Sequence, residues 1–245
     1  MTILVPIKRV VDPYARVRPL ADGSGLDIGS AKFDVNPFDE IAMEQAVRFK
    51  ESDPSVRVVA VSVGGPECEE QLRKALAMGA DEAVLVDTLD ELDPGVVAAE
   101  LGSVCLAQGP DLVLMGKQAT DDDSNQVGQM LAARLGWPQA TFAAQVELRE
   151  GSVTVVRETD NGEQTVRMPL PAVVTVDLRL NEPRYIALPG IVRARSKPLA
   201  RVPRATTATV KTRVLDYSSP PSREAGNKVA DVGELVAALK SRGVL

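Results

Sequence analysis

The stretch VRVVAVSVGGPECEEQLRKALAMGADEAVLV, residues 56–86, decides the fold class of this chain. An aliphatic run over 56–63 has the length and β-branched character of a buried strand, and it ends at Gly64-Gly65-Pro66. Apolar side chains then recur at helical spacing over 72–78, and a second aliphatic run follows over 83–86. A strand, a helix and a strand in this order predict a right-handed unit with two parallel strands.

The same alternation extends through the first 135 residues. Further strands are predicted at 3–10 and 111–115, and further helices at 96–106 and 127–135. Another helix opens at 36–39, where Asn36 can cap, Pro37 suits the first turn and Asp39 complements the positive helix end. This pattern predicts an α/β fold with an open, largely parallel sheet and helices on both faces, of the adenine-nucleotide-binding type.

The pattern changes after Trp137. Strands are predicted at 140–148, 152–158, 164–168 and 172–176, joined by turns such as Asp160-Asn161-Gly162. We expect hairpin or mixed pairing, with antiparallel strands that extend the sheet. Residues 189–224 show no periodicity and predict an extended arm, and 231–241 predict an amphipathic helix. We therefore expect a nucleotide-binding domain over 1–188, and a partner-recognition segment and C-terminal arm over 189–245. An arm of this length suggests an obligate partner.

Composition excludes several function classes. The chain has 245 residues, a net charge of −6 and no histidine, which excludes Ser-His-Asp and Cys-His catalysis and His-ligated zinc. Two cysteines cannot build a four-cysteine metal site, so no metal is expected, and free thiols suit a reducing compartment. An acidic chain is a poor match for nucleic acid. No apolar run is long enough to insert into a membrane, and the N-terminus is predicted to be a first strand rather than a signal peptide.

The loop GKQATDDDSNQVGQ, residues 116–129, is the first candidate binding segment. Ligands of open α/β sheets bind at the carboxyl ends of the strands, where helix N-termini present N–H groups to anions. The Gly-Lys pair is not a P-loop, because position 111 is Asp and Gln118 follows the lysine. Three successive aspartates would repel a phosphate unless they cap a helix or face water. Nucleotide binding and an ordinary polar loop before a capped helix both remain open.

A basic segment is the second candidate. No acidic residue occurs between Glu182 and Asp216, and the cations there are Arg184, Arg193, Arg195, Lys197, Arg201, Arg204, Lys211 and Arg213. Such a segment on an acidic chain would steer an acidic partner surface. The alternative is a solvated arm whose charges pair locally.

Five motifs together carry a family resemblance: VNPFDEIAMEQAVR, KALAMGADEAVLV, KQATDDDSNQVGQ, RETDNGEQTVRMPLPAVVT and VDLRLNEPRYIALPGIVRARSKP. They closely resemble the β subunit of electron transfer flavoproteins, in the same order and over essentially the whole chain. The resemblance implies a heterodimer with an α subunit that carries the redox-active FAD. It further implies that electrons come from acyl-CoA and related flavin dehydrogenases, as in fatty acid oxidation, and pass to a membrane quinone oxidoreductase.

In such proteins the β subunit binds AMP structurally and has no catalytic residue of its own. The compartment would be a bacterial cytoplasm or a mitochondrial matrix. The residues that match the family's AMP contacts are Pro6, Asn36, Pro37, Phe38, Asp39, Val63, Gly116, Lys117, Gln118, Ala119, Thr120, Asp121, Asp122, Asp123, Ser124, Asn125, Gln126 and Val127. Tyr14 approximates an aromatic residue beside the partner's FAD, although Pro13 disturbs the local match.

The resemblance also implies two partner-binding regions. Glu158 matches a carboxylate that pairs with the flavin domain of the α subunit. The dehydrogenase-docking segment matches Arg184, Tyr185, Ile186, Ala187, Leu188, Pro189, Gly190, Ile191, Arg193, Arg195 and Lys197. Leu188 matches the side chain that enters a pocket on the dehydrogenase, and Pro189 is expected to hold it in an extended conformation. Arg193 and Arg195 replace lysines that relatives can methylate, so that regulation is in doubt.

Two rival functions remain. Bifurcating relatives hold a second FAD in place of AMP, and their loop has Ala and Pro where this chain has Asn125 and Gln129. These larger or more polar side chains narrow the space for an isoalloxazine, which favours AMP. The other rival is an ATP-pyrophosphatase-like enzyme, which would need a Ser-Gly-Gly loop after the first strand where this chain has Lys8-Arg9-Val10.

Overall fold

The computed structural model describes residues 1–90, 92–223 and 225–245, which form two compact units. The larger unit comprises residues 1–17 and 28–214, and the smaller comprises residues 18–27 and 215–245. All candidate site residues lie in the larger unit. Across the described ranges, every helix is too short or too polar to pass through a bilayer.

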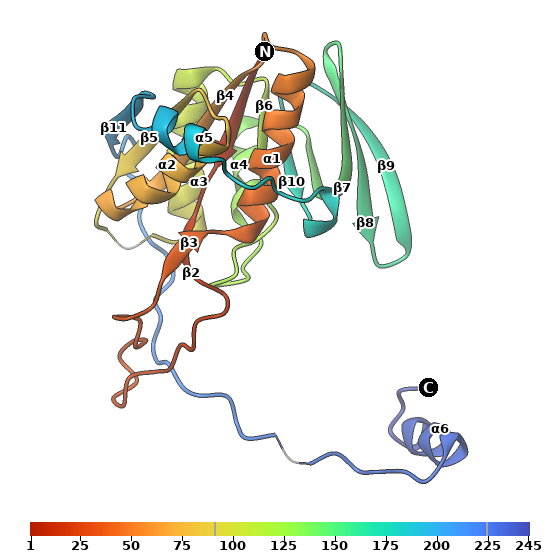
Figure 1. Cartoon of the computed structure of the whole chain (residues 1–245). Coiled ribbons are helices and arrows are strands. Elements are labelled where there is room, and N and C mark those ends of the chain that lie inside the picture. Colours follow the sequence, from red (N-terminus) through yellow and green to blue (C-terminus); the bar gives the residue numbers. More distant parts are fainter. Residues whose placement is uncertain (91, 224) are drawn as a thin grey trace. The chain divides into compact units, whose positions relative to one another are not determined.

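Within the described residues, one sheet contains nine strands in the order β11-β5-β4-β1-β6-β10-β7-β8-β9 (Figure 1). The strands are β1 Thr2–Pro6, β4 Arg57–Gly64, β5 Glu82–Asp87, β6 Leu112–Gly116, β7 Gln139–Arg149, β8 Ser152–Thr159, β9 Gly162–Pro169, β10 Ala172–Val176 and β11 Leu199–Pro203. The strands from β11 to β7 pair in parallel, whereas β7, β8 and β9 pair antiparallel. The predicted parallel sheet with an antiparallel extension is confirmed.

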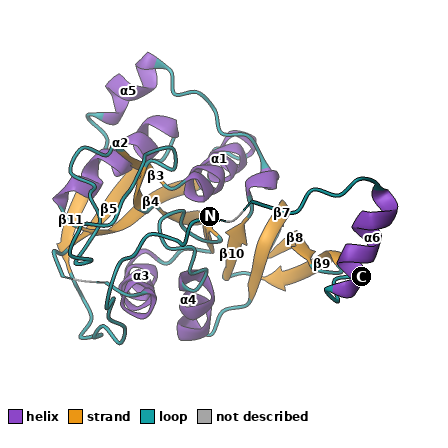
Figure 2. Ribbon diagram, turned by 90° about the horizontal axis from the view of Figure 1, so that it is seen from below, coloured by secondary structure: helices purple, strands orange, loops and turns teal. Residues whose placement is uncertain are grey.

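Helices cover both faces of the sheet (Figure 2). Helices α1 Pro37–Ser52, α2 Glu69–Met78 and α5 Leu188–Ala194 lie on one face, and α3 Pro94–Gln108 and α4 Val127–Leu135 lie on the other. Because successive side chains of a strand point to opposite faces, β1 contributes to two cores. Ile3 and Val5 pack with α1 and α2, whereas Leu4 packs with α3 and α4. The aliphatic runs are therefore buried on both sides.

The first predicted strand, 3–10, is wrong in its extent. β1 ends at Pro6, and Arg9–Val11 forms β2, which pairs with β3 (Phe33–Val35) in a separate antiparallel sheet. The physical reason is at Lys8, whose N–H donates to the Asp39 carboxylate at 2.8 Å, while its carbonyl accepts from Asn36 N–H at 2.9 Å. These bonds take the chain out of the main sheet at the edge where the candidate site lies.

The predicted extended arm is also wrong over its first part. Residues 188–194 form α5, and β11 joins the sheet edge beside β5. Arg73 holds the intervening turn, because its Nη1 donates to the carbonyls of Ala194 and Lys197, both at 2.9 Å. A seven-residue helix and an exposed edge strand leave little periodicity in the sequence. The division of the chain after residue 188 stays a prediction about where the recognition segment begins.

The smaller unit contains the C-terminal helix α6, Val232–Ser241. Asp231 caps it by accepting from the N–H of Glu234 at 2.8 Å, and the predicted amphipathic helix is confirmed. In the same unit, Tyr217 N–H donates to the Gly23 carbonyl at 3.0 Å. No side chain of α6 is buried, and Val232 is 75% exposed.

Candidate nucleotide pocket and docking segment

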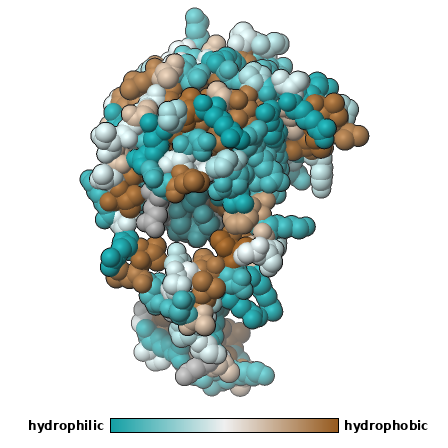
Figure 3. Space-filling model, turned by 90° about the vertical axis from the view of Figure 1, so that its left-hand side faces the viewer, coloured by the Kyte–Doolittle hydropathy of each residue, from teal (hydrophilic) through white to brown (hydrophobic). Residues whose placement is uncertain are grey.

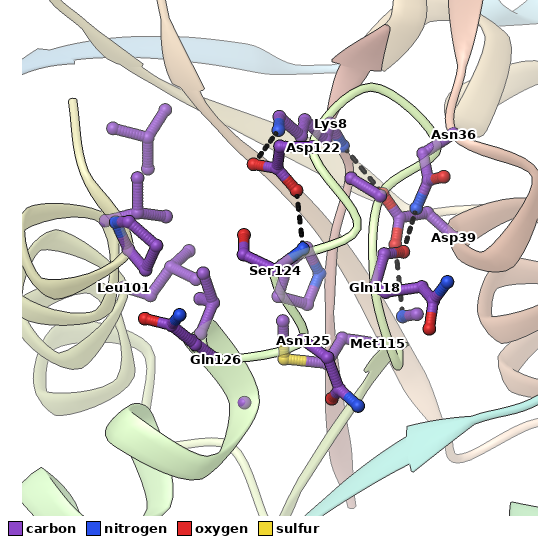
Figure 4. Close-up of a pocket in the computed structure, with 18 of the residues that line it drawn as sticks. Lys8, Asn36, Asp39, Leu101, Met115, Gln118, Asp122, Ser124, Asn125 and Gln126 are labelled. Atoms are coloured by element: carbon purple, nitrogen blue, oxygen red, sulfur yellow. Dashed lines mark hydrogen bonds and ion pairs between the residues drawn. The ribbon is translucent and has the colours of Figure 1, made fainter. Parts of the chain in front are cut away.

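A pocket lies at the carboxyl edge of the parallel strands, where the chain leaves β1, β4 and β6 and enters α1, α3 and α4 (Figure 4). Its cavity of about 180 Å³ is many times larger than the space one water requires. The residues that line it are Pro6, Ile7, Lys8, Asn36, Asp39, Val61, Val63, Leu92, Asp93, Pro94, Val97, Leu101, Met115, Gly116, Lys117, Gln118, Ala119, Asp122, Ser124, Asn125, Gln126, Val127 and Gly128. The pocket is large enough for an organic ligand.

Asp39, in the first turn of α1, joins the ends of two strands. Its carboxylate accepts from the N–H of Lys8 after β1, at 2.8 Å, and from the N–H of Gly116 at the end of β6, at 3.0 Å. Burial raises the pKa of Asp39 to about 7, and the two backbone donors act in the opposite direction. A Cβ on Gly116 would lie 2.4 Å from Asp39 Oδ1 and 2.6 Å from Phe38 Cβ, so only glycine allows this approach.

Asn36 supports the loop rather than capping α1. Its side chain makes no cap hydrogen bond to the helix. Instead Nδ2 donates to the Gln118 carbonyl at 2.8 Å, and Oδ1 accepts from the N–H of Thr120 at 3.3 Å. The prediction of a side-chain cap is therefore wrong, because the loop that crosses over α1 offers Asn36 both a donor and an acceptor. Its amide fixes the loop at the mouth of the pocket.

The three successive aspartates all have local hydrogen-bond or ion-pair partners. Lys8 Nζ lies 2.8 Å from Asp121 Oδ1 and 2.9 Å from Asp122 Oδ2. Burial alone would lower the pKa of Lys8, but these two carboxylates outweigh it and raise the pKa. Asp123 adopts a left-handed conformation with φ 52° and accepts from Gln118 Nε2 at 2.6 Å. None of the three aspartates caps α4. The repulsion of a ligand anion is reduced, because the single charge of Lys8 offsets part of the charge of Asp121 and Asp122.

Lys117 is held away from the phosphate role that lysine has in a P-loop. Its Nζ lies 2.6 Å from Asp177 Oδ2, and both side chains are largely buried. The same Nζ lies 4.7 Å from the ring centre of Phe142 and 5.4 Å from that of Phe38. Phe142 has φ 61°, an uncommon conformation for a bulky residue, at a bulge of β7. Lys117 therefore lines the cavity while its ammonium is engaged by Asp177.

The N-terminus of α4 offers unpaired N–H donors to the pocket. Gln126 is its N-cap, and its side chain makes no cap hydrogen bond. A Cβ on Gly128 would lie 2.4 Å from Thr175 Cγ2, so glycine lets the first turn of α4 approach β10. Uncapped donors and the positive end of the helix dipole favour an anion here. Ser124 and Asn125 lie beside this turn and add polar groups (Figure 4).

The opposite wall is apolar, and sequence reasoning missed it. Pro94, Val97 and Leu101 of α3 line the cavity at helical spacing, and Val61 and Met115 add strand side chains. Leu101 faces the polar loop across the pocket (Figure 4). The signal available was Asp93-Pro94, an N-cap followed by a first-turn proline after a predicted strand, which places that helix start at the same edge. The pocket thus has one apolar wall and one end formed by the uncapped N-terminus of α4.

Most of the predicted AMP residues lie together at this pocket. Those that line it are Pro6, Asn36, Asp39, Val63, Gly116, Lys117, Gln118, Ala119, Asp122, Ser124, Asn125, Gln126 and Val127. Those that support it from outside the lining are Pro37, Phe38, Thr120, Asp121 and Asp123. Within the described ranges, no group of three or more Cys, Asp or Glu side chains is arranged to hold a metal ion.

The predicted docking segment presents exposed apolar side chains. Leu188 is 71% exposed, and Tyr185 and Val192 are also exposed. The expectation that Pro189 holds Leu188 extended is wrong. Leu188 is the first residue of α5, and the extended residue is its N-cap, Ala187, with ψ 146°. A first-turn proline needs no N–H, which explains why the helix tolerates it. On the face that Figure 3 draws, hydrophobic groups are separated by hydrophilic ones.

The cations of the basic segment divide into two groups. Arg184, Arg201 and Arg204 pair with acidic residues of the chain, the first with Glu44 and Glu51. Lys197 Nζ donates to the carbonyls of Leu76 and Ala80 at the C-terminal end of α2, at 3.0 and 2.5 Å. Arg193, Arg195, Lys211 and Arg213 form no ion pair with another described residue. Local contacts therefore engage Arg184, Lys197, Arg201 and Arg204, and the other four cations of the segment remain available.

The two other predicted contact residues lie apart from the pocket. Glu158, at the end of β8, pairs with Arg179 of the 3₁₀ turn Leu178–Leu180. Arg179 is well exposed, so solvent limits the strength of this pair. Tyr14 lies in the loop after β2 and is 96% exposed.

Comparison with known proteins agrees with this architecture. The sequence profile of the electron transfer flavoprotein domain matches residues 28–207. The chain is 49% identical to electron transfer flavoprotein subunit beta of Bradyrhizobium diazoefficiens, with 100% of both chains covered. It is 45% identical to the human subunit beta, covering 99% of this chain and 98% of that protein. It is also 45% identical to the mitochondrial subunit beta of Arabidopsis thaliana, with 98% of each covered.

Proposed function

Because the chain belongs to the electron transfer flavoprotein family and matches its β subunit over its full length, we propose that it is the AMP-binding subunit of a one-flavin carrier. The family is one of electron transport flavoproteins, and the β subunit implies an α partner. In the proposal that partner holds the redox-active FAD, and the redox chemistry belongs to the flavin. This chain contributes a structural nucleotide site and a docking surface, and no catalytic residue.

The observation that carries the AMP proposal is the pairing of an apolar wall with a helix N-terminus in one cavity. The uncapped first turn of α4 suits a single phosphate, since N–H groups and the helix dipole favour an anion. Val97 and Leu101 of α3 suit the flat, weakly polar face of an adenine. Lys8 offsets part of the negative charge of Asp121 and Asp122, which would otherwise oppose a phosphate more strongly. The residues present therefore fit AMP.

The bifurcating alternative, with FAD in this pocket, is less compatible with the loop before α4. Asn125 Oδ1 accepts from Gln129 Nε2 at 2.8 Å, and Asn125 has φ 48° and lines the cavity. A second isoalloxazine would have to displace this hydrogen-bonded pair. The ATP-pyrophosphatase-like alternative gains no support from Lys8, because its ammonium is engaged by two aspartates.

We further propose that the docking segment serves acyl-CoA and related flavin dehydrogenases, and that electrons then pass to a membrane quinone oxidoreductase. Leu188 supports this role, because a single exposed apolar anchor gives a small interface a strong but reversible contact. Within the docking segment, Arg193 and Arg195 are exposed and form no ion pair with a described residue, which suits an acidic dehydrogenase surface. The relatives include bacterial and mitochondrial proteins, so the proposed location is a bacterial cytoplasm or a mitochondrial matrix.

The test is to identify the nucleotides released when the purified chain is denatured, alone and with its α partner, by chromatography and mass spectrometry. AMP from this chain, with one FAD that arrives only with the partner, is the expected result. FAD in place of AMP would refute the one-flavin proposal and favour the bifurcating form. Steady ATP hydrolysis by the purified chain would favour an enzyme instead.

A further inference from the structure

The apolar wall of the pocket is held from outside by residues 204–211, which we call the strap. We propose that the strap positions α3 and thereby sets how tightly the pocket holds the base of its nucleotide, with Thr206 as a positioning residue. The inference rests on the proposed AMP site and deepens it. No residue of the strap lines the cavity, so its effect on a ligand must pass through α3.

Glu100 is the central contact between the strap and α3. It is the one charged residue of that helix and is only 1% exposed. Its Oε2 accepts from the N–H of Ala205 at 2.9 Å, and its Oε1 accepts from Arg204 Nε at 3.2 Å and from Thr206 N–H at 3.3 Å. The Thr206 hydroxyl donates to the same Oε1. A buried carboxylate is costly unless donors satisfy it, and here every donor to Glu100 among the described residues comes from the strap.

A second contact fixes the start of α3. Asp93 Oδ1 accepts from the N–H of Val96 and caps the helix at 2.8 Å, while Oδ2 accepts from the N–H of Lys211 at 2.7 Å. One carboxylate therefore ties the end of the strap to the first turn of α3. Asp93 itself lines the pocket. The strap begins where β11 ends, so it is anchored by the sheet on one side and by Asp93 on the other.

The residues of α3 that line the pocket lie on the helix face next to the one that contacts the strap. Pro94, Val97 and Leu101 are spaced three and four residues apart, and Glu100 falls between the last two. A shift or rotation of α3 that releases Glu100 must move Val97 and Leu101 relative to the loop before α4. The anion-binding end of the pocket belongs to α4 and would stay in place. The strap should therefore affect the apolar part of the ligand and spare the phosphate.

The test compares Thr206→Val, which removes the hydroxyl donor at nearly constant shape, with Thr207→Val. Thr207 is exposed and makes no side-chain hydrogen bond with a described residue, so it is the matched control. Affinities of the full chain for AMP and for ribose 5-phosphate are measured by calorimetry after removal of bound nucleotide. We expect Thr206→Val to raise the Kd for AMP about threefold to tenfold. This change in binding free energy does not exceed the cost of losing one hydrogen bond to a charged group. The Kd for ribose 5-phosphate, the Thr207→Val control and the rescue variant Thr206→Ser should all match the wild type.

Equal AMP affinity in Thr206→Val and Thr207→Val would overturn the inference, and so would a parallel loss for both ligands, which would mean general loosening. If Thr206→Val does not fold, Arg204→Gln removes another donor to the same carboxylate and is measured in its place. A wild-type chain that binds neither ligand would instead overturn the proposed AMP site. Failure of the inference alone is recognised by normal AMP binding in the wild type together with no effect of the strap variants.

Discussion

Replacing Arg184 with alanine distinguishes a structural role of this arginine from the dehydrogenase contact that the family resemblance implies. Arg184 Nε donates to Glu44 Oε2 at 2.7 Å and Nη2 donates to Glu44 Oε1 at 3.1 Å. Two more bonds reach Glu51, at 2.5 and 3.0 Å. The Glu44 carboxylate is 3% exposed, so the substitution leaves a buried charge on α1 with fewer partners. The expected result is a loss of stability.

The magnitude follows from what remains around Glu44. Removing one partner of a buried ion pair typically costs about 3–5 kcal/mol. Glu44 keeps a hydrogen bond from Arg48 Nε at 2.7 Å, so its charge is not left without a partner. We therefore expect a smaller loss of stability, roughly 2–3 kcal/mol. For a chain of this size, 1 kcal/mol corresponds to about 2–4 °C in Tm, so the fall should be roughly 4–12 °C.

The assay is thermal unfolding followed by circular dichroism, with Arg193→Ala as the matched control. Arg193 is exposed on α5 and forms no ion pair with a described residue, so its Tm should barely change. Burial alone would raise the pKa of Glu44, but Arg184 and Arg48 outweigh it and lower the pKa. A carboxylate whose pKa is lowered in the folded state stabilises the fold at pH values above its unfolded-state pKa. This stabilisation is lost as the pH falls through its folded-state pKa. The difference between Arg184→Ala and the wild type should therefore shrink below about pH 4.

The opposite result would refute this reasoning. If Arg184→Ala keeps the wild-type Tm but the assembled heterodimer loses electron transfer from a dehydrogenase, then the Glu44 contact contributes little and Arg184 acts at the docking surface. Loss of both properties together would support the structural role, because a loosened segment also misplaces Leu188. The control Arg193→Ala separates a general charge effect from a loss of Tm; it is not a control for electron transfer, because Arg193 is itself proposed to contact the dehydrogenase.

Three further predictions concern the docking anchor, the pocket and pH. Leu188→Ala should reduce electron transfer from a dehydrogenase about tenfold or more, as for an interface hot spot, with unchanged Tm, AMP and FAD content; loss of the heterodimer would instead make Leu188 structural. Gly128→Ala should destabilise by about 1–3 kcal/mol and weaken AMP binding measured by calorimetry, because its Cβ would overlap Thr175, whereas Gly102→Ala has its nearest contact at 3.8 Å and should bind normally. Burial raises the pKa of Asp39 to about 7, so the folded chain binds a proton at this carboxyl more tightly than the unfolded chain does. The contribution of Asp39 to the free energy of unfolding should therefore fall as the pH rises from about 4 toward 7. Asp39→Asn should flatten that part of the profile in urea unfolding at several pH values, and an unchanged slope would contradict the raised pKa.

The steering role of the basic segment is weaker than its composition suggests. A count of charges in the sequence includes Arg184, Arg201 and Arg204, yet these side chains are engaged by acids from α1, α2 and α3 and the loop before it. Their partners lie more than 100 residues away in the chain. A pattern of charge along the sequence gives no information on such distant pairing.

The pocket illustrates how far local pattern reaches. Asp39 and the loop over 116–127 could be placed together from sequence because the carboxyl ends of parallel strands share one edge. The role of Asn36 could not, because whether its amide caps a helix or holds a loop depends on what packs over it. The sequence did not reveal the wall from Pro94 to Leu101 for a similar reason. An apolar helix face has the same sequence pattern whether it packs in a core or lines a cavity.

The sequence alone determined the α/β architecture. Hydrophobic periodicity and the glycines and prolines that end each element depend on neighbouring residues only, so they can be recognised without the tertiary structure. It also placed the edge where the site lies and the amphipathic terminal helix. Only the tertiary structure shows where the ammonium groups of three lysines are bound. Lys8 and Lys117 form ion pairs with aspartates, and Lys197 donates to carbonyls at the end of a helix. The reason is physical: the partner of a polar group is chosen by packing between distant elements, and the free energy of burying that group depends on the partner.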